Sequence, residues 1–237
     1  MKIALIGYGV MGRLIHVLAE NKGHEIVVAF DEPDRDISAE EMAEKMSEAV
    51  VAIDFTVAAA VRRNVEACLL AGIPIVEGTT GWNDSREEIE RLVADGGGAM
   101  VFGANFSVGV NLFYKIAAYA AELFAKFPEY EAFIEEQHHS RKKDAPSGTA
   151  LKIQEVVGKQ LRKHADVDVR VPVAATRAGN IPGTHRVGFD GPADQILLEH
   201  TARSRDGFAN GAIIAAEWVV GKKGVFEFTN VINEMGD

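Results

Sequence analysis

The residues of this 237-residue chain with the clearest chemical potential lie in one short segment, 136–150, which reads Glu-Gln-His-His-Ser-Arg-Lys-Lys-Asp-Ala-Pro-Ser-Gly-Thr-Ala. His138 and Lys142 are candidates to move a proton, because imidazole titrates near neutral pH and burial or neighbouring cations can tune a lysine. Arg141, Lys142 and Lys143 form the main basic cluster of an acidic protein, and such a cluster suits carboxylates. The segment therefore predicts acid–base chemistry on a carboxylate substrate.

A helix is predicted to begin directly after this basic cluster. Pro146 precedes Ser147, Gly148 and Thr149, whose backbone N–H groups at the helix start find no acceptor within the helix and can bind a second carboxylate. Two anion sites indicate a dicarboxylate. The alternative is a solvated basic loop that Ser147 caps, with the histidines as ordinary polar surface.

A second group of candidates lies near the N-terminus, where Gly7, Gly9 and Gly12 form a GxGxxG motif. The motif follows an apolar run and opens a predicted helix, which is the context in which it binds the pyrophosphate of a dinucleotide. Asp31 closes the next predicted strand, where a carboxylate can accept hydrogen bonds from the adenosine ribose. The alternative is that the glycines serve packing and that Asp31 only caps a strand end.

The rest of the predicted cofactor site consists of loops at the ends of strands. Residues 31–36 are mostly acidic, with Arg35 as their only basic member, so they disfavour a 2′-phosphate and predict NADH as the preferred cofactor, with NADPH as the second choice. Two further loops follow predicted strands and suit the nicotinamide; their residues are Gly78, Thr79 and Thr80, and Gly103, Ala104, Asn105 and Phe106. The alternative is that each loop is an ordinary turn.

Short apolar runs alternate with helical patterns in the first part of the chain, which predicts a parallel sheet covered on both faces. Leu14, Val17 and Leu18 are expected on the buried face of the first helix. The predicted strands are 3–6, 26–30, 50–55, 73–76 and 100–102, and the later helices are 58–70 and 85–93.

The pattern changes after Asn105 and predicts a second, α+β domain with a mainly antiparallel sheet. Its predicted helices are 109–124 and 147–163, and its predicted strands are 130–136, 167–174, 185–189 and 195–201. The chain then returns to a helix, 209–220, and a strand, 225–229, which could rejoin the first sheet. We expect a dinucleotide-binding domain of residues 1–107 plus 206–237, and a substrate-binding and oligomerisation domain of residues 108–205.

Composition narrows the class of protein. The formal net charge of -10 argues against a general electrostatic attraction to nucleic acid or an anionic membrane. Cys68 is the only cysteine, so no intrachain disulfide can form, and spacings typical of zinc sites are absent. The apolar run at the N-terminus is too short for a signal peptide or a membrane span. We therefore expect a cytoplasmic protein with no membrane anchor and no metal.

The segment from His138 to Ala150, written His-His-x-x-Lys-x-Asp-x-Pro-Ser-Gly-Thr-Ala, resembles the signature of the dihydrodipicolinate reductase family. Segments 54–56, 78–81, 104–111 and 208–211 match in the same order. The resemblance implies an α/β fold, a Rossmann-like doubly wound parallel sheet with a second domain that binds substrate and pairs sheets into a homotetramer. It also implies reduction of 4-hydroxy-tetrahydrodipicolinate to tetrahydrodipicolinate by NAD(P)H with loss of water, in diaminopimelate and lysine biosynthesis.

The resemblance also implies roles for individual residues. His138 would donate or accept the proton, Lys142 would donate it, His139 would contact substrate, and Gly148 with Thr149 would bind a carboxylate. The cofactor would contact Gly7, Tyr8, Gly9, Val10, Met11, Gly12, Asp31, Gly78, Thr79, Thr80, Gly103, Ala104, Asn105 and Phe106.

The sequence departs from the family pattern at Val10, where many relatives carry a basic residue that can reach the cofactor phosphates, and this weakens the case for NADPH. Two other functions stay open at this point. One is a different dehydrogenase with a similar domain layout, such as an aspartate or homoserine dehydrogenase, and the other is a non-catalytic NADH sensor.

Overall fold

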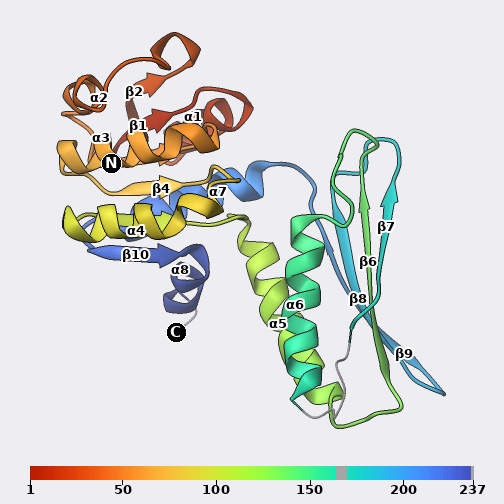
Figure 1. Ribbon diagram of the computed structural model, residues 1–237. Helices are drawn as coiled ribbons and strands as arrows, with labels where there is room; N and C mark the ends of the chain where they lie inside the picture. Colours follow the sequence, from red (N-terminus) through yellow and green to blue (C-terminus); the bar gives the residue numbers. More distant parts are fainter. Residues whose placement is uncertain (164–169, 236–237) are drawn as a thin grey trace. The chain divides into compact units, whose positions relative to one another are not determined.

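The computed structural model describes residues 1–163 and 170–235 (Figure 1). The chain forms two compact units: unit 1 comprises Met1–Val108 and Arg205–Asp237, and unit 2 comprises Gly109–Ser204. Each unit has its own sheet and its own buried core.

Unit 1 is built on a six-stranded sheet in the order β10-β5-β4-β3-β1-β2, in which all pairings are parallel. The last strand of the chain pairs with β5, so the prediction that the chain end rejoins the first sheet is confirmed. The strands are β1 (Lys2–Ile6), β2 (Glu25–Phe30), β3 (Val51–Asp54), β4 (Ile75–Glu77), β5 (Ala99–Phe102) and β10 (Gly224–Glu227).

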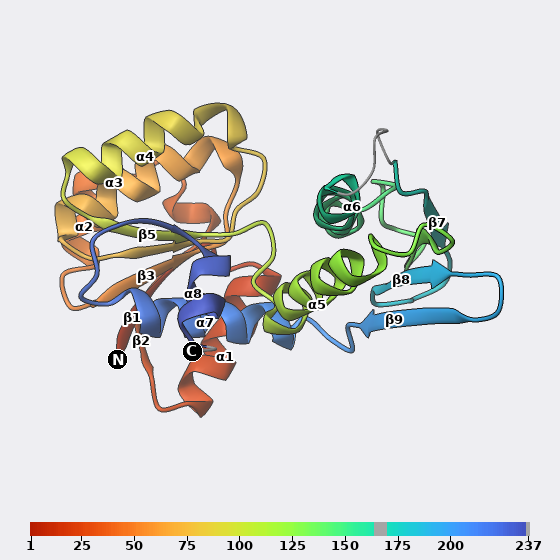
Figure 2. The same ribbon diagram turned by 90° about the horizontal axis from the view of Figure 1, so that it is seen from below.

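Helices cover both faces of this sheet (Figure 2). One face packs against α1 (Val10–Asn21), α7 (Asp206–Val219) and α8 (Phe228–Glu234), and the other against α2 (Ala39–Lys45), α3 (Val61–Ala71) and α4 (Arg86–Asp95). Because both faces are buried, the strands are continuous apolar runs. The doubly wound, Rossmann-like architecture that the sequence predicted is confirmed.

Three details of unit 1 differ from the predictions. Leu14 and Leu18 pack against the core as predicted, but Val17 is 55% exposed, because the fully buried stripe of α1 runs from Gly12 through Ile15 to Ala19. The sequence did not predict α2 or α8. The final strand ends at Glu227 because this residue is the N-cap of α8, and its N–H donates to Asn230 Oδ1 at 2.8 Å.

Single helical turns also occur before three elements of unit 1. They are the 3-10 helices η1 (Glu32–Asp34), η2 (Ala58–Ala60) and η3 (Asn83–Ser85).

Unit 2 is a four-stranded sheet in the order β7-β6-β8-β9, with two helices packed on one face (Figure 2). The pairings of β6 with β8 and of β8 with β9 are antiparallel, and that of β6 with β7 is parallel, so the sheet is mainly antiparallel as predicted. The elements are α5 (Val108–Phe124), β6 (Glu131–His138), α6 (Gly148–Arg162), β7 (Val173–Arg177), β8 (Thr184–Asp190) and β9 (Gln195–Thr201).

The strand predicted at 167–174 lies later in the chain than expected. Residues 167–169 are outside the described residues, and β7 begins at Val173. Pro172 explains the late start, since proline has no N–H to donate to a sheet; its carbonyl accepts from Ile134 N at 2.9 Å instead. Among the helices of the described ranges, none is both long and apolar enough to cross a bilayer.

Candidate active site

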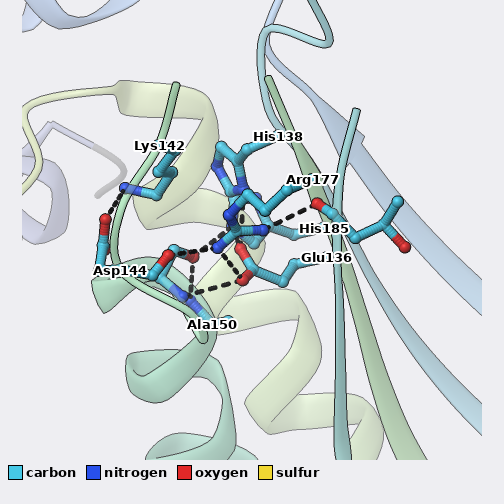
Figure 3. Close-up of polar contacts among 9 residues, drawn as sticks. Glu136, His138, Lys142, Asp144, Ala150, Arg177 and His185 are labelled. Carbon is cyan, nitrogen blue, oxygen red and sulfur yellow. Dashed lines mark hydrogen bonds and ion pairs between the residues drawn. The ribbon is translucent and has the colours of Figure 1, made fainter. Parts of the chain in front are cut away.

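A buried polar cluster forms at the end of β6 in unit 2 (Figure 3). Alternate residues of a strand face the same way, and Ile134, Glu136 and His138 all turn inward. The carboxylate of Glu136 is fully buried; its Oε2 lies 2.8 Å from His138 Nδ1, and its Oε1 lies 2.7 Å from the guanidinium of Arg177. His185 Nε2 is 3.8 Å from the same Oε2. Three strands therefore converge on one carboxylate.

The start of α6 joins this cluster through Ser147. The Ser147 N–H donates to Glu136 Oε1 at 2.9 Å, and Ser147 Oγ accepts from Ala150 N at 3.2 Å while contacting His185 Nε2, also at 3.2 Å. Ser147 is thus the N-cap of α6, and the N–H groups of the exposed Gly148 and of Thr149 belong to its first turn, where a helix supplies no acceptors. This helix start fits an anionic group of a ligand.

The loop between β6 and α6 is held at several points. Lys142 Nζ pairs with Asp144 Oδ1 at 2.9 Å, and the Arg177 guanidinium also donates to the Asp144 carbonyl at 2.5 Å (Figure 3). Arg141 instead donates to Asn180 Oδ1 at 2.9 Å. Of the three basic residues that the sequence grouped together, Lys142 is tied to the loop that leads to α6, and Arg141 is directed to a separate loop.

The electrostatics of the cluster keep the carboxylate charged and the imidazoles neutral. Burial acts to raise the pKa of Glu136, but hydrogen bonds from Ser147 and Arg177 outweigh it and hold this pKa below its usual range. Burial lowers the pKa of His138, against the attraction of Glu136 and with the repulsion of Lys142. A neutral His138 can donate from Nδ1 to Glu136, which leaves Nε2 to accept a proton.

In unit 1, the glycine motif forms the turn between β1 and α1. Gly7 has φ +91°, and a Cβ there would lie 2.4 Å from the carbonyl oxygen of Phe55; a Cβ at Gly12 would lie 2.0 Å from the Gly7 oxygen. A Cβ at Gly9 would meet nothing within 4 Å, and no side chain caps α1. The turn is therefore an open cradle at a helix N-terminus, which fits a cofactor pyrophosphate.

Asp31 directly follows β2, whose last residue, Phe30, accepts from the Gly7 N–H at 3.1 Å. Its Oδ1 accepts from Glu32 N at 2.8 Å, and its Oδ2 lies 3.9 Å from the guanidinium of Arg13. Arg13 also donates to the Tyr8 carbonyl at 3.0 Å. Arg35, the basic candidate from the sequence, pairs with Glu32 at 3.1 Å. The basic group nearest to Asp31 is thus Arg13, which the sequence analysis missed although it directly follows the glycine motif.

The two remaining loops lie at the carboxyl ends of β4 and β5. The ring of Phe55 covers Gly78, where a Cβ would come within 2.3 Å of it. Thr79 is buried and Thr80 is exposed. In the other loop Ala104 is exposed, whereas the side chain of Phe106 is buried in the core, so only its backbone can face a cofactor.

Comparison with known proteins shows which family the chain belongs to. The family model described as dihydrodipicolinate reductase, N-terminus, matches residues 1–106, and that described as dihydrodipicolinate reductase, C-terminus, matches residues 109–232. The chain belongs to the dihydrodipicolinate reductase family. The sequence prediction of this family of oxidoreductases is confirmed, which leaves the alternatives of another dehydrogenase or a sensor without support.

Individual relatives agree with this assignment. The 4-hydroxy-tetrahydrodipicolinate reductase of Christiangramia forsetii is 38% identical over 99% of both chains, and that of Archaeoglobus fulgidus is 37% identical over 92% of this chain and 94% of its own. A dipicolinate-bound dihydrodipicolinate reductase from Paenisporosarcina sp. TG-14 superposes with a TM-score of 0.79 over 97% of this chain and 99% of that one. At 24% identity, the last comparison supports the fold.

In this reductase, the sequence analysis missed three residues of the buried cluster. Glu136 had a detectable signal, because it stands two residues before His138 in a predicted strand and so shares its face. Arg177 and His185 lie on β7 and β8, far away in sequence, and reach Glu136 only through the register of the sheet.

Glu136, His138 and His185 also have donor atoms within 4.8 Å of one another, as in a metal site. Arg177, however, already neutralises this carboxylate, and its positive charge disfavours a second cation at the same place. The absence of a metal stays a prediction, as does the acid–base role of His138.

Acid is expected to destabilise the reductase through His185. Burial, with His138 nearby, lowers the His185 pKa from 6.5 to about 4, so the stability gained from neutral His185 is fully present above pH 6.5 and is lost as the pH falls through 4. The shift corresponds to roughly 3 kcal/mol. Urea unfolding at neutral pH and near the folded-state pKa should show a smaller loss for His185→Gln than for wild type. His16→Gln, in unit 1, is the control and should lose as much stability as wild type. An equal loss in His185→Gln and wild type would contradict the role of His185 in acid destabilisation.

The glycine turn gives a matched pair of variants. Gly12→Ala is expected to cost about 3 kcal/mol of unfolding free energy because its Cβ meets backbone. Gly9→Ala meets open space and should cost less than about 1 kcal/mol, yet weaken NADH binding about tenfold because the methyl group blocks close approach of the pyrophosphate. Urea unfolding and NADH titration separate the two effects. Equal stability losses would show that the turn is not as tight as described.

Proposed function

We propose that this chain reduces 4-hydroxy-tetrahydrodipicolinate to tetrahydrodipicolinate with a nicotinamide cofactor and loss of water, as a step of diaminopimelate and lysine biosynthesis. The observation that carries the proposal is the buried Glu136–His138–Arg177 cluster next to the open start of α6. It joins a tuned imidazole to an anion site. The reductases of Christiangramia forsetii and Archaeoglobus fulgidus, which match nearly the full chain, support the same reaction.

In the proposed mechanism, unit 2 holds the substrate and manages its proton. One carboxylate binds the N–H groups of Gly148 and Thr149, and His139 and Lys142 contact the rest of the molecule. A dicarboxylate beside His138 raises the pKa that burial had lowered, so substrate binding favours the imidazolium form. Glu136 holds the Nδ1 side of His138 and stabilises that charge. His138 and Lys142 are thus the candidate proton donors.

The nicotinamide supplies the hydride, and unit 1 binds the cofactor in this proposal. The nucleotide-binding family of residues 1–106 supports NAD(P)H. We propose NADH as the preferred form, because the segment after β2, where a 2′-phosphate is expected to bind, carries Asp31, Glu32, Asp34 and Asp36. Arg13 is the countervailing charge, since it lies 3.9 Å from Asp31.

The assembly and location are further parts of the proposal. We propose a cytoplasmic homotetramer formed through the sheet of unit 2, with no nucleic acid or membrane partner. Light scattering after size-exclusion chromatography measures the assembly. A monomeric mass at working concentrations would contradict it.

The decisive experiment couples the purified chain to dihydrodipicolinate synthase, pyruvate and aspartate semialdehyde, and follows the loss of NADH or NADPH absorbance. Oxidation that depends on the synthase is the expected result, with the larger kcat/KM for NADH. No oxidation with either cofactor, despite measurable NADH binding, would contradict the reaction. A larger kcat/KM for NADPH would contradict the cofactor preference alone.

A further inference from the structure

Two carboxyl groups that the proposed mechanism does not use lie side by side inside unit 1. Asp54 ends β3 and Glu77 ends β4, and the parallel register places them directly opposite each other. Both side chains are fully buried, and Thr79 makes a hydrogen bond to each of the two carboxyl groups. Two ionised carboxylates in contact, away from water, would repel strongly and lose their hydration.

The hydrogen bonds around this pair leave one oxygen without a donor. Asp54 Oδ2 accepts from Asn64 Nδ2 at 2.7 Å, and Asp54 Oδ1 lies 3.4 Å from the hydroxyl of Thr79. Glu77 Oε1 accepts from the Thr79 N–H at 2.7 Å. Glu77 Oε2 is buried, and no N–H or O–H of the neighbouring residues reaches it. A proton held between Glu77 and Asp54 satisfies this oxygen.

No cation in the described residues contacts the pair. α3 contributes the buried Cys68 thiol and Asn64, and Arg63 acts only through Asn64, donating to its Oδ1 at 3.0 Å. The neighbouring strands contribute the apolar Ile6 opposite Asp54 and Phe102 opposite Glu77. The loops contribute the neutral side chains of Thr56, Thr79 and Trp82. The charge of a second carboxylate would thus stay uncompensated.

We propose that Asp54 and Glu77 share a single proton at neutral pH and act as positioning residues for Thr79, and through it for the cofactor loop 78–80. The functional part of this inference rests on the proposed cofactor site, whereas the shared proton does not. Burial, reinforced by the charge of Asp54, raises the pKa of Glu77 well above its ordinary value, which agrees with the neutral form at this position.

The effect reaches the loop because all the polar atoms of Thr79 are engaged. Its N–H donates to Glu77 and its hydroxyl donates toward Asp54. The same hydroxyl accepts from the Thr56 N–H at 3.0 Å, and the Thr79 carbonyl accepts from Trp82 Nε1 at 2.8 Å. The pair thus fixes the inner side of the loop, while the exposed Thr80 remains on its outer side.

The direction of the pH effect follows from the raised pKa. Protonated Glu77 stabilises the folded state, and this contribution is fully present below the ordinary glutamate pKa and is lost as the pH rises through the folded-state value. Ionisation of Glu77 would place two charges in contact and weaken the hold on Thr79.

The test compares wild type with Glu77→Gln and Glu77→Leu. Glutamine is a neutral isostere whose oxygen can accept from Thr79 N–H and whose NH₂ can donate to Asp54; leucine fills the space but offers no acceptor. The infrared spectrum of the wild-type protein at neutral pH should contain the C=O stretching band of a buried carboxylic acid, and this band should vanish in Glu77→Gln. A wild-type spectrum without this band would overturn the shared proton whether or not the chain proves to be a reductase.

Two further measurements test the positioning role. The fall in wild-type stability with rising pH should flatten in Glu77→Gln, since the amide cannot ionise. Glu77→Leu should raise the KM or Kd for NADH about tenfold, with kcat changing less, because the buried Thr79 N–H loses its acceptor. In Glu77→Gln, which keeps an acceptor, the same KM or Kd should lie within about twofold of the wild-type value. If Glu77→Leu does not fold, Glu77→Gln decides alone. Weak NADH binding in Glu77→Gln at neutral pH, or an unchanged pH profile, would overturn the positioning role.

Discussion

Replacing His138 by glutamine is expected to lower kcat for tetrahydrodipicolinate formation by about 10²- to 10⁴-fold, the usual contribution of a general acid or base, while the Kd for NADH should change less than about twofold. The reason is that His138 is the imidazole whose Nδ1 is held 2.8 Å from the buried carboxylate of Glu136, which leaves Nε2 to exchange a proton. The cofactor cradle lies in the separate glycine turn of unit 1. Stopped-flow turnover and NADH fluorescence titration measure the two quantities.

The same assay distinguishes proton transfer from simple charge at Lys142. Lys142→Ala should lower kcat on the same scale, and Lys142→Arg should recover little, because arginine keeps the charge but stays protonated throughout the working pH range. Lys152→Ala is the matched control, since Lys152 is a lysine of α6 that pairs with Glu155 at 2.9 Å. Wild-type turnover in both His138→Gln and Lys142→Ala would remove these two residues from the proposed mechanism.

The second large effect concerns stability. Arg177→Ala is expected to lower the free energy of unfolding by about 3–5 kcal/mol, because it removes the cation 2.7 Å from the fully buried carboxylate of Glu136. It also removes the donor to the Asp144 carbonyl. Urea unfolding monitored by circular dichroism measures the loss.

A double-mutant cycle identifies the cause. If the loss comes from an uncompensated charge, adding Glu136→Gln to Arg177→Ala should recover stability, since a neutral amide can remain buried beside Ser147 without a counter-ion. If the two single losses simply add, the ion pair is not the source. Arg177→Lys is the matched control that keeps the charge and loses the bridging geometry.

The sequence by itself determined the features that depend on neighbouring residues. The GxGxxG turn from Gly7 to Gly12 is a local strand–turn–helix unit, so its motif and its structure coincide. The N-cap at Ser147 and the start of α6 are equally local. Short apolar runs that alternate with helical patterns predicted the parallel sheet, and the family signature at 138–150 predicted the reductase family. Both patterns consist of residues that are close together in the sequence.

Even local patterns left some details open. Val17 was wrongly placed on the buried face of α1, and the start of β7 was predicted too early, since an apolar valine is compatible with either place. The hydrophobicity of a side chain indicates only that it can be buried, whereas packing against the neighbouring sheet determines which face of a helix is buried.

Only the tertiary structure brought distant residues together. Arg177 and His185 meet Glu136 because β7 and β8 flank β6 in a particular register, and Arg13 approaches Asp31 because α1 and β2 are neighbours. Asp54 and Glu77 are adjacent for the same reason, as ends of paired parallel strands. Strand order and register result from packing over the whole unit. The tertiary structure, and not the local sequence, therefore determined which charged side chains lie next to one another in each site.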